Sequence, residues 1–115
     1  MEDEKGKVFG IGETVFDIIF KDNQPQRAVP GGSTFNALVS LGRVGVPCSM
    51  VTEVGDDQVA DIIYKYLVDN GVDATYAYRH PGTKSHISLA FWMSRTMRIT
   101  PFIKITRVCV WRVRI

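Results

Sequence analysis

Apolar residues gather in five short runs along this chain, separated by polar and glycine-rich segments. The runs cover residues 7–12, 15–21, 47–54, 74–78 and 85–91. Short apolar runs bounded by turn residues predict β-strands. We expect the first strand to be buried, and we expect the polar residues 22–27 to form a turn.

Apolar residues at helical spacing follow Gly31 and Gly32. We expect the hydroxyl of Ser33 or Thr34 to cap this helix at its first turn. The residues predicted to form its buried face are Phe35, Leu38 and Val39.

A second helix is predicted from Asp56 or Asp57, either of which can cap it, to Asn70-Gly71, which can supply a left-handed residue. The apolar residues expected on its buried face are Val59, Ile62, Ile63, Tyr66 and Leu67. The two aspartates resemble a paired-carboxylate site, but helix capping explains them more simply. The order strand–helix–strand favours right-handed parallel units and therefore the α/β class.

The glycine pair has two interpretations. Adjacent glycines let the backbone turn sharply and let another molecule approach closely. Asn36, one turn into the helix, carries both a donor and an acceptor, so a ligand with several hydroxyls can be held there. Alternatively, Gly31 and Gly32 serve the geometry of the chain alone.

Asp17 interrupts an apolar strand. A carboxylate buried there without a partner costs free energy, so it either faces solvent or is held for a ligand. From the residues alone, an edge-strand aspartate and a ligand-binding aspartate are both open.

Composition excludes several classes of protein. The chain of 115 residues, with 45% hydrophobic and 23% charged residues, is typical of one soluble globular domain. No apolar run approaches the ~20 residues of a membrane span, and residues 1–5 do not begin a signal peptide. We therefore expect a cytoplasmic location. Cys48 and Cys109 have no metal-site spacing, and His80 and His86 have no nucleophile or metal partner at a telling spacing.

Charge is distributed unevenly. All 12 acidic residues lie between Glu2 and Asp73, whereas residues 92–115 contain six lysines and arginines and no acid. Such asymmetry is typical of a basic tail for nucleic acid. A small α/β binding module with a nucleic-acid-binding tail is therefore one hypothesis for this chain.

Five motifs, in a fixed order along the chain, favour a hypothesis other than nucleic-acid binding. They are Gly10-x-Gly12-Glu13 with Asp17, Gly31-Gly32-x-x-x-Asn36, Leu41-Gly42-x-x-Gly45, Val54-Gly55-Asp56-Asp57 and Asn70-Gly71-Val72-Asp73. This series resembles the ribokinase/PfkB-type carbohydrate kinases from about residue 6 to residue 91. The resemblance implies the N-terminal part of a ribokinase-like parallel-sheet fold with a small β lid over the sugar.

The resemblance also implies a site. Asp17, Gly31, Gly32 and Asn36 match the positions at which the family grips sugar hydroxyls. The pattern is most similar to fructokinases, and Ser33, where ribokinases carry lysine, argues against ribose. The full-length family uses ATP and Mg²⁺, acts on small-molecule sugars rather than nucleic acid or membranes, and is often homodimeric through its lid.

The family's catalytic machinery belongs to a later part of a longer chain. Its catalytic aspartate stands in a Gly-Ala-Gly-Asp motif, and no Gly-x-Gly-Asp occurs in these residues. We therefore expect no catalytic, cofactor-binding or metal-binding residue here, no bound ATP or Mg²⁺, and a fragment inactive on its own.

The resemblance stops near Trp92, where helical and strand periods also stop. Loss of one base near that codon explains the change, because the neighbouring frame can encode Ser-Leu-Ala-Phe-Leu-Asp-Glu and later Phe-Tyr-Lys-Asp. That concealed sequence resembles the hairpin the family carries at this point. We therefore assign residues 1–91 to a sugar kinase domain and residues 92–115 to a basic tail, out of frame, with no regular element.

Overall fold

The computed structural model of the chain describes residues 6–93 and 96–99. Within these residues the strands form two four-stranded sheets. The first sheet is parallel: β4 (Cys48–Gly55) pairs with β1 (Val8–Ile11), β5 (Val72–Asp73) and β6 (Ala77–His80). The predicted α/β class with a parallel sheet is confirmed.

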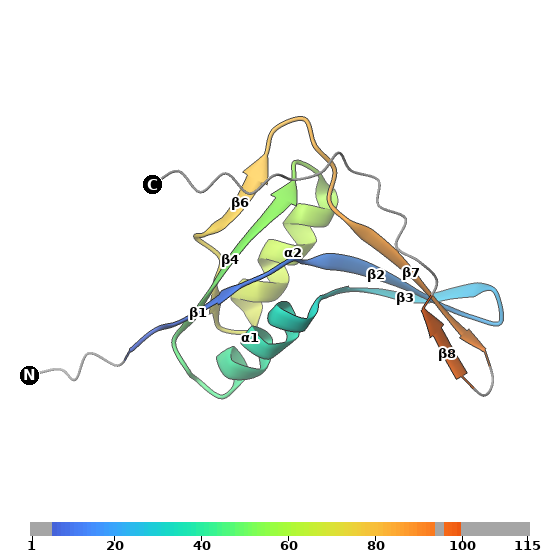
Figure 1. Cartoon of the computed structure of the whole chain (residues 1–115), viewed down its shortest axis with the longest axis horizontal. Helices are drawn as coiled ribbons and strands as arrows, with labels where there is room; N and C mark the ends of the chain where they lie inside the picture. The colour runs from blue at the N-terminus through green and yellow to red at the C-terminus, as the bar shows by residue number, and fades with distance from the viewer. Residues whose placement is uncertain (1–5, 94–95, 100–115) are drawn as a thin grey trace, which may run out of the picture.

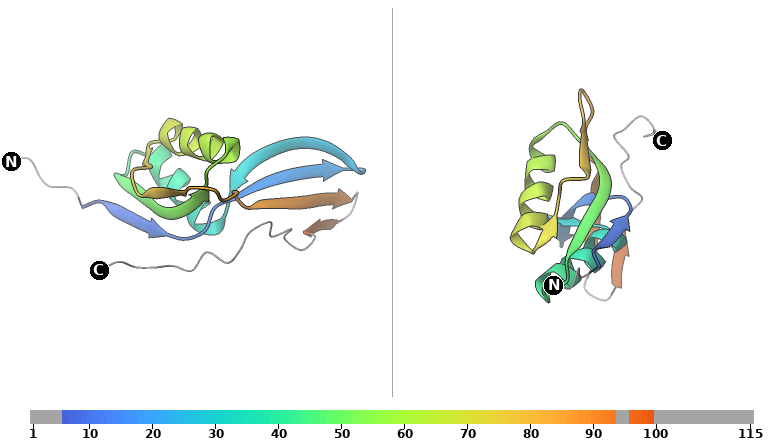
Figure 2. Two further views of the ribbon diagram at one scale, coloured as in Figure 1. Left: turned by 90° about the horizontal axis from the view of Figure 1, so that it is seen from above. Right: turned by 90° about the vertical axis from the view of Figure 1, so that its left-hand side faces the viewer.

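Both helices of the described part cover one face of this first sheet (Figures 1 and 2). They are α1 (Ser33–Arg43) and α2 (Gln58–Asp69). Their apolar stripes meet the sheet in one core cluster because residues three and four apart lie on one side of a helix. The cluster contains Phe35, Leu38, Val39, Cys48, Met50, Val54, Ala60, Ile63, Leu67, Val72 and Ala74.

The second sheet projects away from the helices, on the right of Figure 1. Its strand order is β3-β2-β7-β8, with β2 (Val15–Lys21) parallel to β7 (Ile87–Met93). β3 (Gln24–Gly31) and β8 (Thr96–Ile99) are antiparallel to their neighbours. Strands that leave the main sheet at this point were expected from the family resemblance.

The turn between β2 and β3 is shorter than predicted. Asp22 and Asn23 both have positive φ, 51° and 61°. Two successive residues of this kind form a tight hairpin turn whose twist suits the flanking strands. The polar residues from Gln24 to Arg27 therefore belong to β3, not to the turn.

The expectation that the first strand is buried is wrong. Phe9 and Ile11 in β1 are 53% and 69% exposed. Residue 10, between them on the strand, faces α1, because a Cβ there would meet the side chains of Thr34 and Leu38. Phe9 and Ile11 point the opposite way, to the face of the sheet that neither helix covers.

Both predicted helices are present, but the roles predicted for Ser33, Thr34 and Ile62 are wrong. Phe35, Leu38 and Val39 are buried as predicted, but α1 begins with Gly32 as its N-cap and has no side-chain cap from Ser33 or Thr34. In α2, Ile62 is 42% exposed, and Ala60 takes a buried place instead.

Later strands are displaced from the predicted runs. Residues 74–76 lead through a turn into β6, which begins only at Ala77, and β7 begins at Ile87 and continues to Met93. Residues 96–99 form β8, so the expectation that no regular element follows Trp92 is wrong there. Residues 100–115 of the predicted tail lie outside the described residues, as does Cys109.

None of the helices in the described residues is long and apolar enough to cross a membrane. Cys48 is a free, buried thiol, and burial raises its pKa. Its Sγ contacts the carbonyl oxygen of Leu38 at 3.5 Å, so the thiol serves the packing of α1 on β4.

Candidate functional site

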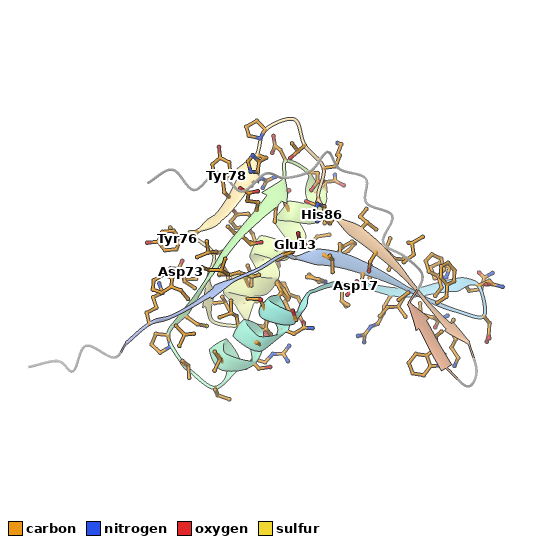
Figure 3. All side chains as sticks on the ribbon, viewed as in Figure 1. Glu13, Asp17, Asp73, Tyr76, Tyr78 and His86 are labelled. Atoms are coloured by element: carbon orange, nitrogen blue, oxygen red, sulfur yellow. The ribbon has the colours of Figure 1, made fainter. Side chains whose placement is uncertain are left out.

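The end of β1, the start of β2 and the first turn of α1 come together in the middle of the molecule. The hydroxyl of Thr34 donates to the carbonyl oxygen of Ile11 at 3.4 Å, which ties α1 to the end of β1. Val15 lies opposite Gly31 in the β2–β3 ladder. The two predicted glycines therefore lie beside the strand that carries Asp17, which Figure 3 labels.

Asp17 lies between two strands, opposite Val29 on β3 and Ser88 on β7. The Ser88 hydroxyl donates a hydrogen bond to Oδ1 of Asp17, and Ser88 is only 4% exposed. The other oxygen, Oδ2, lies against Gly31, where a Cβ would collide with it. Asp17 is thus neither an unpartnered charge nor a freely moving edge residue.

Glycine is required at position 32 because of its backbone conformation and a neighbouring carbonyl group, and not because of Asp17. Its φ is 118°, a conformation that L side chains rarely adopt, and it is the N-cap of α1. A Cβ on Gly32 would lie 2.6 Å from the carbonyl oxygen of Glu13. The chain's own packing therefore demands both glycines, whether or not a ligand approaches them.

Asn36 lies one turn into α1. Its backbone N–H donates to the carbonyl oxygen of Gly32 at 2.9 Å, and the residue is exposed. Within the described residues, no hydrogen bond joins its side chain to Asp17. The structure thus places Asp17 against Gly31, and Asn36 a helical turn beyond the glycine pair.

Asp17 and Ser88 form a polar pair on one face of the second sheet, which also carries Val15, Ile19 and Ala90. Because alternate residues of a strand face opposite ways, Asp17 and Ser88 share one face and their neighbours occupy the other. The apolar neighbours, all partly exposed, are Phe16, Ile18, Phe20, Ile87, Leu89 and Phe91. The rings of Phe20 and Phe91 stack with centroids 4.8 Å apart.

Asp57 is the central acceptor of a second polar cluster, which lies at the end of β4. It caps α2 by accepting from the Ala60 N–H at 2.9 Å, and it accepts from the Ser85 N–H and hydroxyl, each at 2.7 Å. Burial raises the pKa of Asp57, but these hydrogen bonds outweigh burial and hold the pKa below its usual value. Asp56 instead pairs with Arg79 at 3.3 Å. The capping interpretation is confirmed for Asp57 and is wrong for Asp56.

A small polar hollow adjoins this cluster. Its lining includes Thr14, Glu53, Lys84, Ser85 and His86. Nε2 of His80 is buried and lies 3.0 Å from Oε1 of Glu53, but among the described residues it has no partner with hydrogen-bond geometry. Among residues 6–93 and 96–99, no group of three acidic, histidine or cysteine side chains is arranged to hold a metal ion.

Sequence reasoning missed Ser88. Its only local signal is a polar residue between Ile87 and Leu89 in an apolar strand. Ser88 can be linked to Asp17 only through the parallel pairing of β2 with β7, because the two residues are 71 positions apart in the sequence.

The chain matches the model of the pfkB family carbohydrate kinases over residues 5–101. It is 31% identical over 70 residues to aminoimidazole riboside kinase of Salmonella typhimurium, covering 61% of this chain and 22% of that protein. It is also 31% identical over 70 residues to a fructokinase of Escherichia coli, with 61% and 23% coverage.

A solved structure shares the fold. An uncharacterized sugar kinase from Pyrococcus horikoshii, determined in complex with ATP, superposes with a TM-score of 0.75 at 20% identity, over 85% of this chain and 34% of that one. The family match spans most of the chain, and this protein belongs to the PfkB family of carbohydrate kinases. The chain spans less than a quarter of the length of the two curated relatives.

Proposed function

We propose that this chain supplies the sugar-binding side of a kinase that transfers the γ-phosphate of ATP to a hydroxyl of a sugar, with fructose as the substrate. The observation that carries the proposal is Asp17. Its carboxylate is fixed at one oxygen by Ser88, and its other oxygen lies over a position without a side chain, Gly31.

A carboxylate in this setting suits a sugar. Ionised Asp17 is an acceptor only, and sugar hydroxyls are donors that need acceptors once they leave water. Asn36 adds an amide with both a donor and an acceptor on the first turn of α1. The missing side chain of Gly31 leaves room for Oδ2 of Asp17, and that of Gly32 leaves room for the carbonyl oxygen of Glu13.

Fructose is favoured over ribose on two grounds. One relative with 31% identity is a fructokinase. Ser33 stands directly after the glycine pair, where ribokinases carry a lysine. The riboside kinase of similar identity makes a riboside the competing substrate to test.

Catalysis is assigned to residues other than these 115. The sequence contains no Gly-x-Gly-Asp, the family's signature of the catalytic base. The described residues contain no acidic cluster suited to Mg²⁺. We therefore expect no ATP-dependent phosphorylation of fructose by this polypeptide alone. ATP and Mg²⁺ are cofactors of the complete kinase.

The second sheet is proposed to be the lid. One of its faces carries Asp17, and a lid over the sugar keeps water from the phosphoryl group during transfer. Its opposite face is proposed to pack against a second copy, because partly exposed aromatic and aliphatic side chains continue along both β2 and β7.

The alternative of a nucleic-acid-binding module rests on the basic residues of 92–115 alone. Membership in the carbohydrate kinase family favours the sugar hypothesis over it.

Saturation-transfer NMR on the chain separates the two hypotheses. Fructose and ribose are offered in turn, and a single-stranded oligonucleotide is titrated at several salt concentrations. We expect fructose to bind more tightly than ribose. Oligonucleotide binding with a steep salt dependence, and no sugar binding, would contradict the proposal.

A further inference from the structure

Asp17 is held by a hydroxyl from a distant part of the chain. Ser88 faces Asp17 directly in the parallel β2–β7 ladder, and its Oγ donates to Oδ1. Ser88 is 4% exposed, so its hydroxyl has little access to water. A buried hydroxyl needs a partner, and Asp17 is that partner.

This pair is not needed to join the two strands. β2 and β7 run in register from Phe16–Ile87 to Lys21–Trp92, so backbone hydrogen bonds already hold them together. A valine or isoleucine suits a buried strand position better than serine does. We therefore attribute the serine at this position to its hydrogen bond with the carboxylate of Asp17.

Ser88 fixes the orientation of the Asp17 carboxylate. With the Ser88 proton on Oδ1, the carboxylate plane is fixed and Oδ2 is turned toward Gly31. Oδ2 fills the place that a Cβ on the buried Gly31 would take. Among the described residues, the side chain of Asp17 accepts a hydrogen bond from Ser88 at Oδ1 and from no group at Oδ2. Asp17 is partly exposed, so a ligand hydroxyl that reaches Oδ2 meets an acceptor whose orientation is already fixed.

We propose that Ser88 is a positioning residue for sugar recognition: it occupies Oδ1 of Asp17, so that Oδ2 is the oxygen that accepts from a substrate hydroxyl. The inference rests on the proposed sugar-binding role of Asp17. It adds that the substrate contacts chiefly one oxygen of Asp17 and that Ser88 itself does not touch the sugar.

The test is a double-mutant cycle on the 115-residue chain with D-fructose as the probe. Dissociation constants come from NMR titrations of the wild type, Asp17→Ala, Ser88→Ala and the double variant. Ser88→Thr keeps the hydroxyl. Ser88→Cys nearly keeps the volume but offers only a weak donor. The amide spectrum of each variant reports whether the fold is intact.

We expect Ser88→Ala and Ser88→Cys to weaken fructose binding about three- to tenfold, the effect of one lost hydrogen bond. Ser88→Thr should stay close to the wild type. In the Asp17→Ala background, Ser88→Ala should change the dissociation constant by less than about twofold, because the hydroxyl then has nothing to position. If Ser88→Ala fails to fold, the comparison of Ser88→Cys with Ser88→Thr provides the same test.

Two results overturn the inference alone. In the first, Asp17→Ala weakens binding and the Ser88 variants do not. In the second, Ser88→Ala weakens binding equally with and without Asp17, which would mean that Ser88 touches the sugar or acts on the fold. If fructose does not bind the wild type, or Asp17→Ala leaves binding unchanged, the proposed function fails and the inference fails with it.

Discussion

At the scale of single residues, Asp17 and the glycine pair explain each other. The sequence alone allowed an edge-strand aspartate or a ligand-binding one, and it allowed glycines for chain geometry or for a ligand. The structure shows that Gly31 is small because Oδ2 of Asp17 lies against it, and that Gly32 is glycine because its φ is 118°. A geometric role for the glycines and a sugar-binding role for Asp17 are therefore compatible.

Asp17→Ala should weaken the sugar and not the nucleotide. In a chain extended to include the family's catalytic part, we expect the fructose KM to rise roughly five- to two-hundredfold, from about 1–3 kcal/mol of lost hydrogen bonding. The ATP KM should stay nearly constant because the nucleotide site lies elsewhere. Asp69→Ala on the exposed surface of α2 is the matched control. An unchanged fructose KM in Asp17→Ala would make Asp17 a purely structural residue.

Gly32→Ala should destabilise the fold itself. Positive φ and the collision with the Glu13 carbonyl oxygen act together, so we expect a loss of about 1–3 kcal/mol in the free energy of unfolding. Gly45→Ala is the control, since Gly45 has φ 84° but open space around its Cβ position. Urea denaturation should show the larger loss for Gly32→Ala. Equal losses would mean that backbone strain alone sets the requirement at Gly32.

At the scale of the elements, Asp57 joins the start of α2 to the segment that leads into β7. Its side chain accepts from Ala60 within the helix and from Ser85 beyond β6. Loss of this cap and of its link to Ser85 should cost more than loss of an isolated cap.

Asp57→Ala should lower the free energy of unfolding by about 1–2 kcal/mol at pH 7. The pKa of Asp57 is lower in the folded chain than in the unfolded one. The stabilisation is therefore complete above the unfolded pKa, near 4, and is lost as pH falls through the folded pKa. Denaturation at pH 7 and at pH 3 should show a smaller difference between variant and wild type at pH 3. A difference that grows on acidification would contradict the assignment.

Local sequence patterns predicted most helices and strands, but they could not predict which strands distant in sequence pair with each other. Val15–Lys21 forms a strand with the predicted bounds, and α1 buries Phe35, Leu38 and Val39 as its spacing indicated. The burial of β1 was predicted wrongly because a helix on only one face of a sheet cannot be read from an apolar run. Ser88 was missed because its partner is set by the register of two strands far apart in sequence.

At the scale of the whole molecule, the parallel sheet has one covered and one open face. Phe9, Ile11, Tyr76 and Tyr78 are each more than half exposed. The curated relatives are more than four times as long as the matched part of this chain. In a kinase of that length, further segments are expected to cover such apolar surface.

The boundary at residue 92 is a proposal that DNA can decide. The family match continues to residue 101, whereas acidic residues are absent from 92 onward. If one base is missing near the codon of Trp92, the neighbouring frame should continue as a kinase-like sequence beyond residue 115. Sequencing of the coding DNA checks this directly. Stop codons throughout that frame would contradict the frameshift hypothesis.

We propose that a sugar binds beside Asp17, between the second sheet and the first turn of α1. The most direct test is a residue-resolved NMR titration of the wild-type chain with D-fructose, which follows each backbone amide. We expect saturable shifts at Asp17, Gly31, Gly32, Asn36 and Ser88, with little change in the second half of α2. Saturable shifts confined to other residues, or no shift at any fructose concentration, would contradict this proposal.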